Sequence, residues 1–75
     1  MNNYIYDIVT KECLFITDVQ FPRIPVKGDF INLAEFTMDI SDYYKYKDNS
    51  PCEVVTVVLN REFADIYINL NKEFE

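Results

Sequence analysis

Apolar and polar positions alternate along much of the chain with the two-residue period of β-strands. The clearest case is 64–70, where Ile66 and Ile68 share one face and polar or aromatic side chains occupy the other. A Val-rich run at 52–59 precedes it, and the polar segment 60–62 lies between them. Two β-prone runs joined by a short polar connection are typical of a hairpin, so we predict strands at 52–59 and 64–70.

A second hairpin is predicted at the N-terminus. Residues 4–9 and 13–21 are rich in β-formers, and the polar residues 10–12 connect them. Both runs carry apolar residues on both faces near the turn. Either another segment covers the outer face, or the strands curl so that each side is partly buried.

The segment after the first hairpin cannot continue a central strand. Pro22 and Pro25 lack the amide donor that a sheet ladder needs, so we predict an extended crossing segment there. Gly28, the only glycine, follows, and a turn at this position needs a positive φ that side chains resist. A short strand is predicted at 30–33.

The sequence of residues 34–50 does not decide whether this segment is helix, strand or loop. Their apolar side chains, with the preceding leucine, are spaced like the stripe of a helix, namely Leu33, Phe36, Ile40, Tyr43 and Tyr44. Weak helix formers and the like charges of Glu35 and Asp39 oppose a helix. A short helix over 34–42 and a non-helical segment are therefore equal alternatives, and a polar tail at 71–75 is expected to fray.

The predicted fold is a single domain over 1–75, mainly β, with five strands. An open antiparallel sheet of this size leaves much apolar surface in water, and closing it into a barrel removes edges. We therefore predict a small, five-stranded, partly open SH3-like barrel, antiparallel throughout. Its predicted core consists of Ile5, Phe15, Ile16, Ile31, Val55, Val57, Ile66 and Ile68, and Val57→Ala is expected to cost about 1–3 kcal/mol.

Short motifs outside 34–50 resemble a known group of proteins. They are the run Phe21-Pro22-Arg23-Ile24-Pro25-Val26-Lys27-Gly28-Asp29-Phe30-Ile31, the Val-rich run Val54-Val55-Thr56-Val57-Val58, and the closing Ile66-Tyr67-Ile68. This pattern is similar to that of small uncharacterised SH3-like β-barrel proteins of Bacteroides-type bacteria, their phages and mobile elements. The resemblance implies the barrel fold and a phage or mobile-element setting, but no activity and no catalytic residues. The insertion at 34–50 departs from the tight connection of that group.

Charge narrows the choice of partners. Seven basic residues stand against thirteen acidic ones, for a net charge of −6. Nucleic acid and anionic membrane surfaces attract basic proteins, so both are disfavoured, whereas a basic protein partner is compatible. The chain has no stretch of about 20 apolar residues and no signal-peptide pattern at its start, which favours a cytoplasmic protein.

Groups for catalysis are scarce. Histidine is absent, and one glycine cannot build a phosphate-binding loop, so we expect no enzyme, no cofactor and no metal. Carboxylates such as Asp29, Glu35 and Asp39 are expected to be solvated rather than catalytic. Cys13 and Cys52 are expected to be buried, inert and unbridged thiols, since no basic cluster lies near them in sequence and no export signal is present.

The segment 34–50 is the only long connection, and binding sites concentrate on long loops of rigid scaffolds. It combines acids with aromatic residues, and tyrosine is favoured at interfaces because it offers a large area and a polar end. The predicted partner-binding residues are Glu35, Phe36, Asp39, Asp42, Tyr43, Tyr44 and Tyr46. The alternative is that the aromatic residues cap an open end of the barrel.

Two functions remain. The first is a non-enzymatic protein-binding module, such as a phage or mobile-element inhibitor or regulator of a host protein, with a homo-oligomer left open. The alternative is a nucleic-acid-associated accessory β-barrel that uses the tyrosines with the basic residues Arg23, Lys27, Lys45 and Lys47. Convergence of these four cations beside the tyrosines favours the second function, and acids grouped with aromatic residues favour the first.

Overall fold

The computed structural model describes residues 2–49 and 51–70, so the expected fraying of 71–75 lies outside the described chain. Within the described residues five strands are present: β1 (Asn2–Asp7), β2 (Cys13–Thr17), β3 (Phe30–Ile31), β4 (Cys52–Leu59) and β5 (Phe63–Asn69). Three short helical segments lie between β3 and β4: the 3₁₀ helices η1 (Leu33–Phe36) and η2 (Lys47–Asn49), and the α-helix α1 (Ile40–Tyr46).

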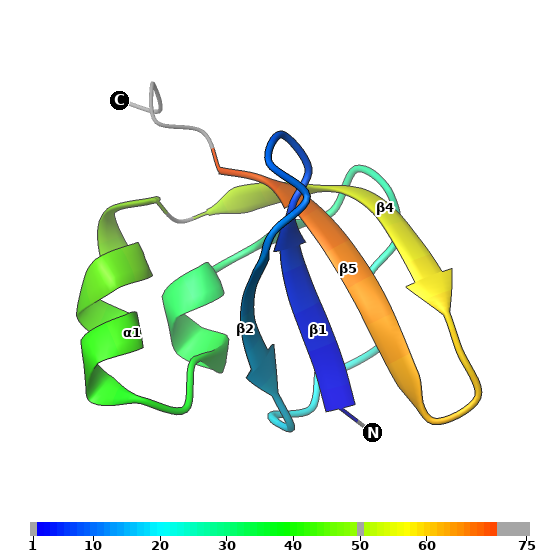
Figure 1. Cartoon of the computed structure of the whole chain (residues 1–75), viewed down its shortest axis with the longest axis horizontal. Coiled ribbons are helices and arrows are strands. Elements are labelled where there is room, and N and C mark those ends of the chain that lie inside the picture. The colour runs from blue at the N-terminus through cyan, green and yellow to red at the C-terminus, as the bar shows by residue number, and fades with distance from the viewer. Residues whose placement is uncertain (1, 50, 71–75) are drawn as a thin grey trace.

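The strands form one curved sheet in the order β2-β1-β5-β4-β3, a half-barrel whose open side faces the helical segments (Figure 1). This confirms the predicted mainly β, five-stranded, partly open barrel. The prediction of an antiparallel sheet was wrong, because β1 and β5 at its centre run parallel, with Ile5 opposite Ile66. The two hairpins meet at this pairing, and no local turn between β1 and β5 sets their relative direction.

The C-terminal hairpin is confirmed almost as predicted. β4 and β5 pair antiparallel, and the Asn60 amide donates to the Phe63 carbonyl at 2.8 Å to close the turn. The Asn60 side-chain amide also donates to Asp65 Oδ2 at 3.2 Å. The ladder skips one residue at Val55, which therefore forms a β-bulge.

The N-terminal hairpin is shorter than predicted. β2 ends at Thr17, whose hydroxyl accepts a hydrogen bond from the Val19 amide at 3.1 Å and turns the chain. At the other end of the hairpin Asp7 is buried. Its carboxylate accepts a hydrogen bond from the Val9 amide at 2.9 Å, within the connection to β2. A β-bulge interrupts the pairing of β1 with β2 beside Leu14.

Gly28 adopts the predicted positive φ, 96°. Its amide donates to the Val54 carbonyl at 2.9 Å, and the Val54 amide donates to the Asp29 carbonyl at 2.8 Å. Two residues thus face one residue of β4, and this bulge directs the chain into β3. β3 itself spans Phe30–Ile31, two residues fewer than predicted, because η1 begins at Leu33.

The insertion contains helical segments, as one of the two alternatives for the region near 34–42 predicted, but the α-helix begins later, at Ile40, and ends at Tyr46. η1 ends where the Thr37 hydroxyl and amide both donate to the Ala34 carbonyl. α1 then begins after Asp39, an extended residue whose carboxylate accepts from the amide and hydroxyl of Ser41, both at 2.9 Å. Such N-capping satisfies amides at the start of a helix, so it fixes where α1 begins.

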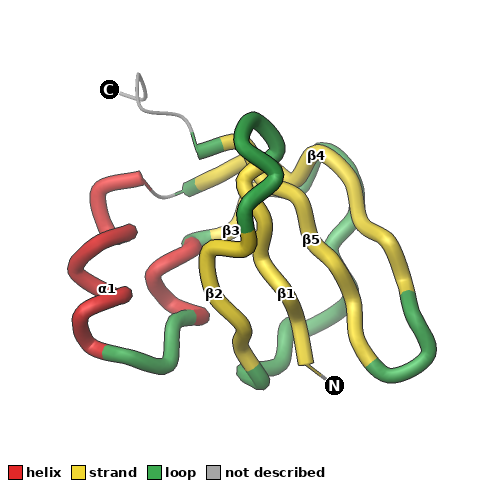
Figure 2. The backbone as a smooth tube through the Cα atoms, viewed as in Figure 1, coloured by secondary structure: helices red, strands yellow, loops and turns green. Residues whose placement is uncertain are grey.

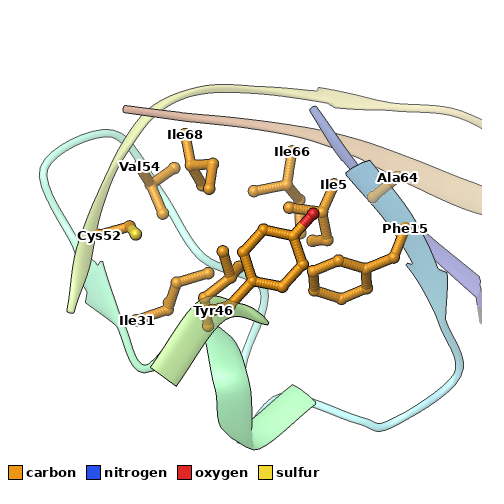
Figure 3. Packing of buried hydrophobic residues seen from close by; sticks show 10 residues of the cluster. Ile5, Phe15, Ile31, Tyr46, Cys52, Val54, Ala64, Ile66 and Ile68 are labelled. Atoms are coloured by element: carbon orange, nitrogen blue, oxygen red, sulfur yellow. The ribbon is translucent and has the colours of Figure 1, made fainter. Parts of the chain in front are cut away.

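The core lies between the inner face of the sheet and the helical segments (Figure 2). The sheet contributes Ile5, Phe15, Val54, Ile66 and Ile68 among others, and Figure 3 shows the Tyr46 ring of α1 inserted beside Phe15. The ring centroids of Tyr46 and Phe15 lie 5.4 Å apart. Leu33 of η1 is fully buried as well.

Five predicted core residues are buried: Ile5, Phe15, Ile31, Ile66 and Ile68. The prediction was wrong for Ile16, which is 50% exposed because neighbours on a strand point to opposite faces and Phe15 faces inward. Val55 sits at the bulge and is only partly buried, and Val54 takes the core position instead. Val57 is partly buried and packs against the edge of the core.

The outer face of the sheet carries its own aromatic pairs. Tyr6 and Tyr67 stack with ring centroids 4.8 Å apart, and Tyr4 and Phe63 pack at 5.1 Å. All four side chains are partly buried by one another across β1 and β5. These pairs shield the central parallel ladder from water and account for the apolar residues on both faces of the first strand.

The two valines on β4 provide a matched test of the inner face. Val54→Ala removes methyl groups from a fully buried site, so we expect a loss of about 2–3 kcal/mol in unfolding free energy. Val57→Ala is expected to cost about 1 kcal/mol, because its site is only partly buried. Urea unfolding followed by circular dichroism measures both, and an equal or reversed order would contradict this assignment of the inner face.

Candidate binding surface on the helical insertion

Two neighbouring hollows open beside the helical segments. The larger, with a volume of about 480 Å³, is named the aromatic groove here. One wall is the crossing segment with Phe21 and Arg23, and the other is formed by residues 29–32 along β3. Glu35 and Phe36 of η1 close one side.

Three phenylalanines give the groove its apolar character. Phe21 and Phe36 pack against each other with ring centroids 4.2 Å apart, although 14 residues lie between them in the chain. Phe30 is 62% exposed. An aromatic side chain that stays exposed forgoes the stabilisation that its burial would give. This surface is therefore suited to being covered by another molecule.

An ion pair connects the two walls. Arg23 donates to both carboxylate oxygens of Asp29, at 2.8 and 3.0 Å, and the Val26 amide donates to Asp29 Oδ2 at 2.9 Å. The hydrogen bond from Arg23 is the main cause that lowers the pKa of Asp29, and the hydrogen bond from the Val26 amide adds to it. The hydrogen bond to Asp29 in turn raises the pKa of Arg23. The crossing segment is thereby fastened to the start of β3, and the charge of Arg23 is largely balanced.

The second hollow, named the helix pocket, has a volume of about 290 Å³. It lies where η1 passes into α1, and Glu35, Met38, Asp39, Ile40 and Tyr43 line it together with smaller residues. Met38 and Ile40 are mostly exposed. Glu35 borders both hollows, so the aromatic groove and the helix pocket meet at this carboxylate.

The structure brings most of the predicted binding residues to this region. Glu35, Asp39 and Tyr43 line the helix pocket, and Phe36 lines the groove. Tyr44 is 60% exposed and packs edge-on against Tyr43, with ring centroids 5.5 Å apart. Asp42 is partly buried on the first turn of α1 and lines neither hollow.

Tyr46 does not belong to this surface, and its assignment as a binding residue was wrong. It is 3% exposed and packs on Phe15 in the core, so it closes the open side of the barrel as the alternative interpretation proposed. Burial raises the pKa of Tyr46 against the opposing effect of Lys45. Tyr43, three positions earlier on α1, is 38% exposed, so the two tyrosines differ in burial and in role.

Sequence reasoning missed Phe21, Phe30 and Met38, and it named Arg23 only for the nucleic-acid alternative. Phe21 and Phe30 lie on either side of the proline segment, which the sequence marked only as a crossing. Their signal was present, since apolar residues next to a segment that cannot enter a sheet must pack elsewhere or remain exposed. Met38 carried no such signal.

The two cysteines differ from each other. Neither forms a disulfide among the described residues, but Cys13 is exposed at the start of β2, so the expectation that it is buried was wrong. Cys52 is fully buried, and burial raises its pKa to about 11. Partial burial and, after it, the carboxylate of Asp65 also raise the pKa of Cys13. The error at Cys13 arose because the bulge beside Leu14 pairs Cys13 with Tyr6, which lies on the outer face of the sheet.

Comparisons of this chain with protein-family models, with curated proteins and with solved structures found no match. Within residues 2–49 and 51–70, no three cysteine or carboxylate side chains come together as metal ligands do. No helix in that part of the chain has the length and apolar character to cross a membrane.

Replacing Arg23 tests the ion pair of the groove. In Arg23→Gln the pKa of Asp29 should rise toward its usual value, while that of Asp39, lowered by its hydrogen bonds from Ser41, should stay. Because folding lowers the pKa of Asp29, its stabilisation is present above the unfolded value of about 4 and is lost as pH falls through the folded value. An NMR titration of the carboxyl carbons measures both groups, and an unchanged Asp29 pKa would show that Arg23 does not engage it.

Thiol alkylation tests the contrast between the cysteines. At pH 8 a thiol with a pKa of about 11 is ionised in about one molecule in a thousand, and Cys52 is also inaccessible. Iodoacetamide should therefore add one group per folded chain, at Cys13, and a second only after denaturation. Mass spectrometry of intact protein and of peptides reads this out. If no group is added until a reductant is supplied, the two thiols are bridged.

Proposed function

We propose that this protein is a non-enzymatic binding module that recognises another protein through the aromatic groove and the helix pocket, together called the insertion surface. The observation that carries the proposal is the grouping of exposed apolar side chains with carboxylates where the two hollows meet. The exposed apolar side chains of the region are Phe30, Met38, Ile40, Tyr43 and Tyr44.

The composition of this surface matches what protein interfaces use. Aromatic residues and methionine are enriched at interfaces because they bury large areas and adapt to their partner. Tyr43 and Tyr44 also support each other edge-on, which limits the rotamer freedom lost on binding. Other exposed apolar side chains, such as Ile16 and Val58 on the outer sheet face, lie outside the two hollows.

Charge supports a basic partner. Glu35 and Asp39 lie at the helix pocket, Asp42 lies on the adjacent turn of α1, and the whole chain carries a net charge of −6. Carboxylates at the rim of an apolar surface increase the rate of encounter with a cationic partner and reject anionic ones. We expect most of the affinity to come from the buried apolar contacts.

The nucleic-acid alternative has less support. Arg23 is paired with Asp29, and Lys27 lines a separate hollow beside β4. Lys45 and Lys47 lie over the rings of Tyr46 and Tyr44, at 5.4 and 5.3 Å from the centroids. Lys45 and Lys47 thus lie at tyrosines of α1, whereas Arg23 and Lys27 belong to the crossing segment and Arg23 is paired. Stacking platforms for single strands instead combine aromatic residues with a continuous basic groove.

The biological setting is part of the same proposal. The resemblance of the proline–glycine turn and the Val-rich strand to proteins of phages and mobile elements suggests an inhibitor or regulator of a host protein that acts in the cytoplasm. A small domain without a catalytic group acts by occupying a surface on its target. Self-association through the insertion surface is a competing use of the same residues.

A double substitution on α1 tests the function. Tyr43→Ala with Tyr44→Ala removes two exposed rings, so we expect a folded protein whose affinity for its partner falls about tenfold or more. Partners are captured from the native host with tagged wild-type protein and identified by mass spectrometry, and binding of the purified partner is then measured by calorimetry.

The matched control is Val9→Ala, which changes a residue that is 76% exposed on the β1–β2 connection. It should bind as the wild type does. Partner binding that survives the double substitution would reject the insertion surface. Salt-sensitive binding to DNA or RNA in place of a protein would support the alternative function.

A further inference from the structure

We propose that the aromatic groove receives an extended segment of the partner, which adds to the sheet along β3 and places a basic side chain beside Glu35. This inference rests on the proposed function and specifies its chemistry. The occupant is a strand-forming peptide with alternating apolar residues and at least one lysine or arginine.

The first argument is the open edge of the sheet. β3 is the last strand in the order β2-β1-β5-β4-β3, so only one of its sides is paired. Hydrogen-bonded and non-hydrogen-bonded pairs alternate in an antiparallel ladder. Because the Val54 amide binds the Asp29 carbonyl, the next pair, Phe30 with Glu53, is a non-hydrogen-bonded one. The amide and carbonyl of Phe30 therefore point away from β4, toward the free edge.

The second argument is the course of the groove. Its wall includes the four consecutive residues 29–32, so the hollow follows the β3 edge and does not merely touch it. A strand laid along this edge would place every second side chain over the groove. The exposed ring of Phe30 and the packed pair of Phe21 and Phe36 offer apolar contacts to those side chains. Backbone hydrogen bonds with alternating pockets are the basis of peptide recognition by strand addition.

The third argument is charge. The one ion pair among the described residues joins Arg23 to Asp29, so the guanidinium at the groove is already engaged. Glu35, which closes one side of the groove, is exposed and has no cationic partner in the described chain. A lysine or arginine of the incoming segment would supply that partner. A second copy of this chain fits less well, because each copy carries a net charge of −6.

The test uses peptides as probes and needs no native partner. Wild-type protein selects binders from a phage-displayed library of random peptides, and the enriched sequences are synthesised and measured by calorimetry. We expect alternating apolar positions with an enriched basic residue. Glu35→Lys should weaken binding about tenfold or more, because it replaces attraction by repulsion. The control Glu62→Lys makes the same change of charge on the exposed β4–β5 connection, outside both hollows, and should leave binding within about twofold.

Two readouts at Phe30 distinguish strand addition from other binding in the groove. In the wild type, hydrogen exchange of the Phe30 amide, followed by NMR, should slow when peptide is bound. Phe30→Pro removes the outward amide and the ring, and Phe30→Ala removes the ring alone, so the proline variant should bind about fivefold more weakly than the alanine variant. If the proline variant does not fold, the exchange measurement on the wild type decides.

The outcomes separate this inference from the proposed function. Peptides that depend on Glu35 but leave exchange of the Phe30 amide unchanged would overturn strand addition while the insertion surface stands. Enriched peptides without basic residues would overturn the proposed occupant. Peptides that bind Glu35→Lys as tightly as they bind the wild type would overturn it as well. Failure to enrich any peptide would also overturn it. The proposed function would then be tested separately, by measuring how tightly the native partner binds the variant with Tyr43 and Tyr44 replaced.

Discussion

A single curved sheet cannot cover its own inner face, and this constraint governs the structure. Ile5, Val54, Ile66 and Ile68 project from three neighbouring strands into one apolar surface that must be shielded from water. In a chain of 75 residues the segment between β3 and β4 does this, through the buried side chains of Leu33 and Tyr46. Because η1 and α1 are short, each directs few residues inward, and the rest of the insertion remains at the surface. The insertion thus serves the core and the candidate site together.

Local signals in the sequence were enough to predict the strands and the bend at Gly28, because each depends on residues close in the chain. The parallel pairing of β1 with β5 was out of reach, since the direction of two strands from opposite ends of a chain depends on the whole topology. The bulges at Leu14 and Val55 also escaped prediction. Each adds one residue to a strand and shifts the alternation between faces, which is why Val54, and not Val55, is in the core.

The helical stripe from Leu33 to Tyr44 was a real pattern with a different cause. Its spacing fits one face of a single helix, which was one of two equal alternatives, but the helical path is interrupted between Thr37 and Asp39, so its members lie on two separate helices. Leu33 is buried, whereas Ile40 and Tyr44 are exposed. The capping residue Asp39, followed by Ser41, was the available signal for this break. The sequence therefore pointed to the segment that lines the helix pocket, but the aromatic groove, built with the distant Phe21, required the structure.

The two edge strands of the sheet, β2 and β3, differ in length and surroundings, and this difference bears on recognition. β2 is a five-residue edge without charged residues, the kind of strand that pairs with other chains unless it is obstructed. Just past its end the Asp18 amide donates to Met38 Sδ at 3.4 Å, so the insertion contacts the chain where β2 stops. β3 remains open, but it has only two residues and lies against a groove with a carboxylate at its side. An edge that short gives too few backbone hydrogen bonds for indiscriminate pairing, and a segment that binds there must also match the groove and its charge. Specificity would then come from the side chains of the insertion and the crossing segment, with the backbone of β3 setting the direction of the bound strand.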